Sequence, residues 1–135
     1  MKKLLLIITI AVAGQASVFA QHNPDPIGKA FFPPEMVMQN QQTINLTEAQ
    51  RNSISKEMQN AQSEFMNLQW ELEKETEKFK ALIQKEKTAE DNVIEQLEQM
   101  LTIENKIKKR QISLLIKIKN LLSHEQQETL QKLKG

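Results

Sequence analysis

The segment Ile54–Leu82, ISKEMQNAQSEFMNLQWELEKETEKFKAL, decides the fold of this chain. Its apolar side chains recur every three or four residues, with one longer step across Glu75. They are Ile54, Met58, Ala61, Phe65, Leu68, Leu72, Phe79 and Leu82. This period is typical of a helix that presents a narrow apolar seam to a second helix. The segment therefore predicts one arm of a helical hairpin.

The segment lies within a run of residues, 35–134, that contains neither glycine nor proline. Leu, Glu, Gln and Lys are abundant in this run, and all four are strong helix formers. Tyrosine is absent, and no alternating apolar run is bounded by turn residues, so strands are not expected. The predicted fold class is all-α.

Helix start signals divide the chain into four predicted helices, at about 34–43, 48–86, 89–121 and 124–134. Thr47-Glu48-Ala49-Gln50 and Ser123-His124-Glu125-Gln126 both have the spacing of a capping box, in which side chain and backbone satisfy each other. Thr88 precedes two acidic residues and is predicted to cap the third helix.

The third helix carries a matching seam with polar interruptions at Glu104 and Gln111. Its members are Val93, Leu97, Met100, Ile107, Leu114, Ile118 and Leu121. The connection between the two long helices is as short as Lys87-Thr88, which makes them antiparallel. Both exceed about 45 Å at the rise of a helix. We expect an elongated hairpin with the short helices folded against its open end.

The first twenty residues have the layout of a secretory signal peptide. Lys2 and Lys3 precede an apolar run, and Val18-Phe19-Ala20 places small residues where signal peptidase requires them, so cleavage is predicted after Ala20. A retained membrane anchor is the alternative. The apolar run is short for a membrane span, so no stable insertion is expected after cleavage.

The mature chain is then expected to have an extended arm over 21–33, where the prolines lie, and a helical domain over 34–135. Removing two lysines and no acids changes the formal net charge from +1 to −1. A near-neutral chain has no global charge to attract nucleic acid, and none is expected as a partner. The absence of cysteine excludes thiol catalysis and zinc–thiolate sites.

Several apolar residues of the two long predicted helices lie outside the hairpin seams. Met66 and Trp70 lie more than about 100° from one seam on a helical wheel, and Ile112 and Ile116 point away from the other. Because the start of one helix meets the end of the other, we expect the two pairs to lie at the same end of the hairpin. Short helices or a second copy of the chain would cover them, or a partner or client protein would bind them. Ordinary exposure of single apolar residues is the third interpretation.

A basic stripe lies beside Ile112 and Ile116, in a part of the chain that has no acidic residue. It consists of Lys106, Lys109, Arg110 and Lys117. A mixed basic and apolar surface suits loose binding of unfolded chains, because charge accelerates encounter and apolar contact retains the ligand. The alternative is a solvated face that keeps the protein soluble.

No catalytic constellation is recognisable, and the chain is not expected to be an enzyme. The alternative to a protein-binding role is binding of a divalent transition metal. The candidate ligands are His22, Met36, Met38 and His124. Met36 and Met38 are two residues apart on a predicted helix, so they do not face each other. A site would need ligands from separate segments or from a second subunit. No other cofactor is expected.

Leu46-Thr47-Glu48-Ala49-Gln50 matches the Leu-Thr-x-x-Gln motif of the CpxP/Spy family, and Leu122-Ser123-His124-Glu125-Gln126 resembles its second copy. The resemblance covers most of the mature chain. It implies a periplasmic, cradle-shaped antiparallel homodimer of four-helix chains. The motif residues Leu46, Thr47, Gln50, Leu122, Ser123 and Gln126 would have a structural role.

Spy-like members of this family are ATP-independent chaperones, and CpxP-like members also restrain an envelope-stress sensor kinase. The implied partners are therefore unfolded or misfolded envelope proteins, or the periplasmic domain of a sensor kinase. ZraP and CnrX, which are related, bind zinc, nickel or cobalt. This chain has no histidine cluster in its N-terminal helix, which argues against metal sensing.

Overall fold

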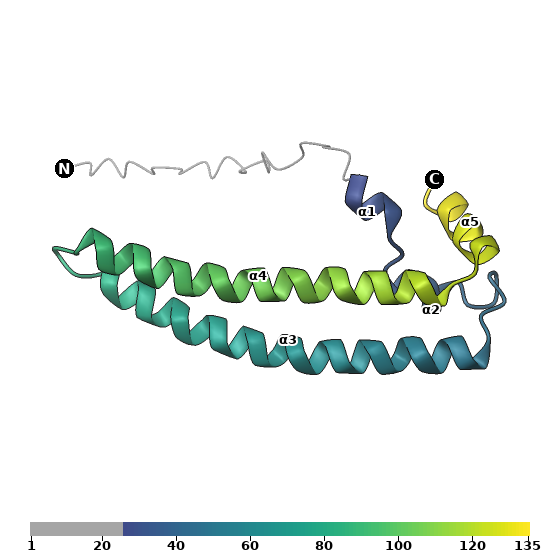
Figure 1. Cartoon of the computed structure of the whole chain (residues 1–135), viewed down its shortest axis with the longest axis horizontal. Coiled ribbons are helices and arrows are strands. Elements are labelled where there is room, and N and C mark those ends of the chain that lie inside the picture. Colours follow the sequence, from purple (N-terminus) through teal and green to yellow (C-terminus); the bar gives the residue numbers. More distant parts are fainter. Residues whose placement is uncertain (1–25) are drawn as a thin grey trace, which may run out of the picture.

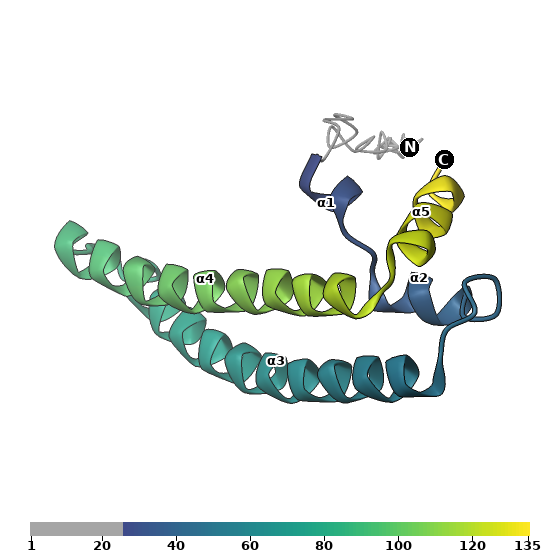
Figure 2. The same ribbon diagram turned by 45° about the vertical axis from the view of Figure 1, so that its right-hand side comes forward.

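The computed structural model describes residues 26–135, all of whose regular structure is helical. The helices are α1 (Pro26–Ala30), α2 (Pro34–Gln39), α3 (Glu48–Ile83), α4 (Glu90–Leu121) and α5 (His124–Leu133). As predicted, α3 and α4 form a long antiparallel hairpin, and the short helices gather at its open end (Figures 1 and 2). The predicted signal peptide and His22 lie outside the described residues.

The four predicted helices correspond to α2–α5, and the first is shorter than expected because Asn40 ends it. The Asn40 backbone N–H and side-chain amide both donate to the carbonyl of Met36, at 3.2 and 2.8 Å. A side chain that competes in this way for backbone acceptors favours a helix end over another turn. Asn45 then adopts a left-handed conformation, with φ of 50°. Residues 40–45 consequently form turns that lead into α3.

The arm predicted to be extended over 21–33 contains the short helix α1, so that prediction was wrong for Pro26–Ala30. The reason lies at the other end of the chain. The Lys134 ammonium group donates to the carbonyls of Gly28 and Lys29, at 3.2 and 3.1 Å, and to that of Phe31. It thereby satisfies acceptors that the end of a helix leaves open. Burial, with the nearby charge of Lys119, lowers the pKa of Lys134.

The start of α4 also differs from the expectation. Thr88 does not cap this helix, which begins one residue later, with Ala89 at the N-cap and no side-chain hydrogen bond there. Glu90 and Asp91 lie in the first turn, as expected. Their negative charges interact favourably with the positive end of the helix dipole, so a capping hydroxyl is not required.

The seam of α4 contains two residues that the predicted pattern left out. Ile103 is buried, and the side chain of Arg110 is only 12% exposed. Together with Met100, Ile107 and Leu114 they continue the alternation of three- and four-residue steps that contact with a second helix requires. The polar interruptions expected at Glu104 and Gln111 were wrong, because both residues are exposed beside the seam.

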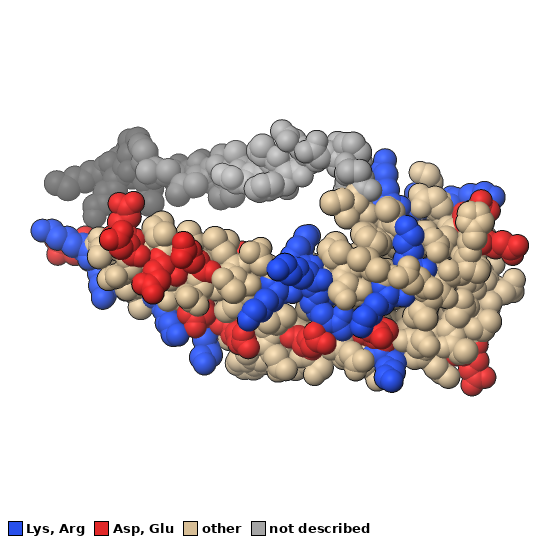
Figure 3. Space-filling view, in the orientation of Figure 1, with Lys and Arg blue, Asp and Glu red and all other residues tan. Residues whose placement is uncertain are grey.

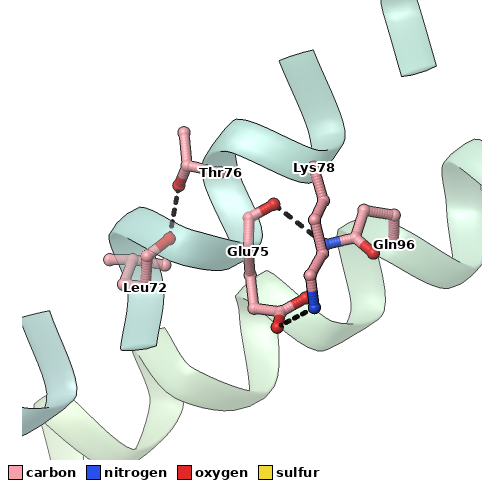
Figure 4. Close-up of polar contacts among 5 residues, drawn as sticks. All are labelled: Leu72, Glu75, Thr76, Lys78 and Gln96. Carbon is pink, nitrogen blue, oxygen red and sulfur yellow. Dashed lines mark hydrogen bonds and ion pairs between the residues drawn. The ribbon is translucent and has the colours of Figure 1, made fainter. Parts of the chain in front are cut away.

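The polar interruption predicted in α3, Glu75, does lie against α4 (Figure 4). The Gln96 amide donates to the backbone carbonyl of Glu75 at 2.9 Å and to its carboxylate at 2.7 Å, and Lys78 binds the same carboxylate at 2.8 Å. Hydrogen bonds from Lys78 and Gln96 lower the pKa of Glu75. A polar pair within an apolar seam favours one alignment of the two helices over shifted ones.

Close to this pair, the Thr76 hydroxyl donates to the carbonyl of Leu72 at 2.7 Å (Figure 4). Such bonds to the preceding turn often bend helices, as does a side chain that binds a helix carbonyl from outside. Both occur here, and α3 is visibly curved (Figures 1 and 2).

The main hydrophobic core lies at the open end of the hairpin, where all the helices from α2 onward contribute to it. Its buried members are Phe32, Val37, Ile44, Leu46, Ile54, Ala61, Leu114, Ile118, Leu122 and Leu130. Towards the hairpin tip the seam is narrow, and Ile83, Ile94 and Leu101 are exposed. Within 26–135, none of the helices combines the length and apolarity required to cross a bilayer.

Candidate functional site: the glutamine clasp and the exposed faces

The two motif copies meet at the open end of the hairpin. Thr47 and Gln50 form the capping box of α3, and Ser123 and Gln126 form that of α5, as predicted. In each box the glutamine carbonyl oxygen accepts from the N-cap backbone N–H, at 3.0 Å for Thr47 and 2.9 Å for Ser123. Both glutamine side chains are therefore held in a defined orientation before they make any contact outside their own helix.

Each glutamine then bonds to the other motif. The Gln50 amide nitrogen donates to the Gln126 side-chain oxygen at 2.8 Å, and the reverse bond measures 3.0 Å. Gln50 also donates to the Leu121 carbonyl at 2.8 Å, and Gln126 to that of Ile44 at 3.1 Å. We call this arrangement of Gln50 and Gln126 the glutamine clasp. It joins the start of α3 to the end of α4 and the start of α5.

Leucine precedes each capping box, and both leucines belong to the core. Leu46 and Leu122 are buried, and Gln126 is the only buried polar residue among those described. Burial makes the clasp bonds stronger and the loss of either partner more costly. The sequence predicted the two caps but not the bonds between them. The repetition of the same motif at both ends of a predicted hairpin is the signal that could have indicated this contact.

Met66 and Trp70 point away from the seam, and the short helices of the chain do not cover them, since Trp70 is 66% exposed. They border a shallow depression of about 570 Å³ that is lined by α3 alone, and Phe65 and Leu72 also line it. We call these four residues the α3 face. Such an apolar surface on a well-packed helix is suited to contact with another apolar surface.

Ile112 and Ile116 border a different depression, of about 390 Å³, which is lined by α4 alone. Lys108, Lys109 and Lys117 surround them, and we call these five residues the α4 face. The two depressions share no lining residue. The sequence predicts only that the two pairs lie at the same end of the hairpin, and in the structure each pair borders its own depression, one on α3 and the other on α4.

Two of the four residues of the predicted basic stripe form ion pairs with glutamates of α3. Lys106 and Lys109 are exposed, but Arg110 lies in the seam and its Nε donates to a carboxylate oxygen of Glu64 at 2.7 Å. Lys117 pairs with Glu57 at 3.0 Å. The prediction of Arg110 as a surface residue was therefore wrong, since its alkyl chain fills a seam position.

Basic side chains nevertheless gather over the C-terminal half of α4, whereas acidic ones lie towards the hairpin tip (Figure 3). From Lys106 to Lys119 the helix has six basic residues and no acid, and from Glu90 to Glu104 it has five acids and no base. The two halves of α4 therefore present opposite charges, and the α4 face lies in the basic half.

A sequence profile described as "Heavy-metal resistance" matches residues 4–129, nearly the whole chain. The chain belongs to the heavy-metal resistance family. This family comprises CpxP-, Spy- and ZraP-like proteins with the Leu-Thr-x-x-Gln motif, so the resemblance predicted from the two motif copies is confirmed. No curated protein and no solved structure matches the chain significantly.

Membership in the heavy-metal resistance family raises the question of a metal site. Over residues 26–135, no three His, Cys, Asp or Glu side chains come together in a way that could hold a metal ion. Met36 packs against the core, and His124 is exposed beside Glu128, with 3.3 Å between its Nε2 and the carboxylate. The described residues of one chain therefore do not form a donor set of the kind that structural or catalytic metal sites require.

Proposed function

We propose that this protein is a periplasmic, ATP-independent binding protein that holds partly unfolded envelope proteins or engages the periplasmic domain of a sensor kinase. The observation that supports this most directly is the exposure of large apolar side chains, above all Trp70, on helices that already pack against each other through a separate seam. Single exposed apolar residues are common, but faces that combine several of them are typical of interaction surfaces. The family match is compatible both with this role and with a metal-responsive one.

The α4 face is the better candidate for client contact, because it combines Ile112 and Ile116 with surrounding lysines. The lysines would speed encounter with acidic segments, and the isoleucines would contribute the apolar contact. The α3 face would then be available to a second copy of the chain, in the antiparallel homodimer that the resemblance implies. Export with cleavage after Ala20 would deliver the chain to the periplasm.

The chaperone proposal predicts that the mature protein suppresses aggregation of a thermally unfolding client without ATP. Replacing Ile112 and Ile116 together with serine removes most of the apolar area of the α4 face. We expect roughly tenfold more protein to be needed for equal suppression, the equivalent of losing one buried aliphatic side chain. Light scattering of the client at several chaperone concentrations measures this change.

The matched control replaces Ile83 and Ile94 with serine, because these two isoleucines are also exposed but lie near the hairpin tip. This control is expected to protect the client as well as the unsubstituted protein does. Equal loss in both variants would assign the effect to general hydrophobicity, and full protection by a folded Ile112→Ser/Ile116→Ser variant would remove the α4 face from client binding.

A metal-responsive role is the second candidate, and the family description is the observation that favours it. Calorimetric titration of the mature protein with zinc, nickel and copper distinguishes the two roles. If the protein is primarily a binding protein for other proteins, we expect no saturable heat below millimolar metal. Tight binding that disappears in a His22→Ala/His124→Ala variant would instead establish metal sensing or buffering.

A further inference from the structure

Arg110 has an unusual environment for a cation. Its side chain lies in the α3–α4 seam, and its Nη1 is a buried donor with no hydrogen-bond partner within residues 26–135. Burial of a guanidinium group is unfavourable unless its donors are satisfied. The single bond from Nε to Glu64 leaves that requirement incomplete. Arg110 is therefore a cation with unused hydrogen-bonding capacity.

A groove of about 520 Å³ opens beside the Arg110 side chain, between α3 and α4. Besides Arg110 and Leu68, its lining includes Lys106 and Lys109, the neutral donors Asn67 and Ser113, and a single acid, Glu64. The three cations outnumber the one carboxylate, so the groove has a net positive charge. We call it the Arg110 groove. Its donors and charge are suited to an anion that carries several oxygen acceptors.

The carboxylate of Glu64 already shows how such an anion can approach. It lies 2.7 Å from Arg110 Nε, the Glu64 side chain is 55% exposed, and no other bond to that carboxylate is found among the described residues. An exposed, singly bonded carboxylate is held only weakly. It can swing into solvent when a ligand with better geometry takes its place.

We propose that the Arg110 groove is a binding site for a small oxyanion, either a carboxylate or a phosphate-type group. The ligand displaces the Glu64 carboxylate from Nε and accepts two parallel hydrogen bonds from Nε and Nη2, the solvent-facing edge of the guanidinium group, a geometry that arginine provides and lysine does not. Lys106 and Lys109 add charge at the rim. The site concerns a small ligand and does not depend on the proposed binding of client proteins.

The test uses the full mature protein titrated separately with inorganic phosphate and with acetate, at constant ionic strength maintained with chloride. We expect saturable shifts in the amide NMR signals around residues 106–113, with millimolar affinity for at least one of the two. Preference for phosphate or for acetate identifies the class of ligand. Arg110→Leu should weaken binding at least about tenfold, because charge-assisted bonds of this kind are strong.

Two further variants make the result specific. Glu64→Gln removes the competing charge and should tighten binding several-fold, whereas Arg110→Lys keeps the charge but not the parallel donors and should bind nearly as poorly as Arg110→Leu. Lys117→Gln is the control, because it removes a positive charge from the same helix but lies outside the groove lining. It should change the affinity less than about twofold, as expected for a screened charge.

The proposal is overturned if neither anion binds saturably, or if Lys117→Gln weakens binding as much as Arg110→Leu does. Weaker binding by Glu64→Gln would also contradict it, since the displaced carboxylate would then be part of the site. Arg110→Leu is expected to fold, because an apolar side chain of similar size is often tolerated in place of a buried charge. If the unsubstituted mature protein binds the anion but does not protect a client, the proposed function is contradicted and the anion site is not.

Discussion

Replacing Gln126 with leucine is expected to lower the free energy of unfolding by about 3 kcal/mol, through loss of the buried hydrogen bonds of the clasp. The variant leaves the Ser123 N–H and the Ile44 carbonyl without their partner and removes both bonds between Gln50 and Gln126. Leucine is similar in size but can neither donate nor accept. Urea unfolding followed by circular dichroism measures the change.

Gln131→Leu is the matched control, because Gln131 is an exposed residue of the same helix. It should change the free energy of unfolding by less than about 0.5 kcal/mol. A Gln50→Leu/Gln126→Leu double variant tests the mutual bonds themselves. Its loss should be clearly smaller than the sum of the two single losses, because both single variants break the same pair. Additive losses would mean that the two glutamine side chains do not stabilise each other.

Truncating Leu130 to alanine should have a comparable or larger effect, a loss of about 2–5 kcal/mol. Leu130 is fully buried, at 0% exposure, and is the residue through which α5 enters the core. Removing its branched end both forfeits apolar burial and leaves a cavity among side chains that cannot fully collapse. Urea unfolding gives the global loss, and hydrogen exchange of the α5 amides shows whether this helix detaches first.

Leu133→Ala provides the comparison, since Leu133 lies one turn further along α5 and is 50% exposed. The same atoms are removed, but little buried surface is lost, so a change below about 1 kcal/mol is expected. Similar losses for Leu130→Ala and Leu133→Ala would show that α5 is not anchored as the structure indicates.

Both of these large effects arise at the open end of the hairpin, where Leu114 and Ile118 of the core alternate along α4 with Ile112 and Ile116 of the α4 face. The core and the clasp hold together the start of α3, the end of α4 and the start of α5, and the narrow seam keeps α3 and α4 packed along the rest of the hairpin. The buried residues that stabilise the fold and the exposed residues of the α4 face therefore lie on opposite sides of the same turns of α4. A substitution on the α4 face is therefore interpreted as an effect on binding only when urea unfolding shows that the free energy of unfolding is unchanged.

Local sequence patterns determined the all-α class, the antiparallel hairpin and both capping boxes. These features depend on residues close together in the chain: the spacing of Ile54, Met58 and Ala61 on one helix face, or the three-residue separation of Ser123 and Gln126. The family could be predicted for the same reason, because its motif is a local pattern that occurs at both ends of the hairpin. Interactions of this range can be inferred without knowledge of the fold.

Other features depend on contacts between distant residues, and only the tertiary structure decided them. The mutual bonds of Gln50 and Gln126 join residues 76 positions apart, and the helix at Pro26–Ala30 is completed by Lys134 from the opposite end of the chain. The burial of Arg110 depends on how α4 is rotated against α3. That rotation is set by packing of the whole seam and of the core at the open end, which no local pattern specifies.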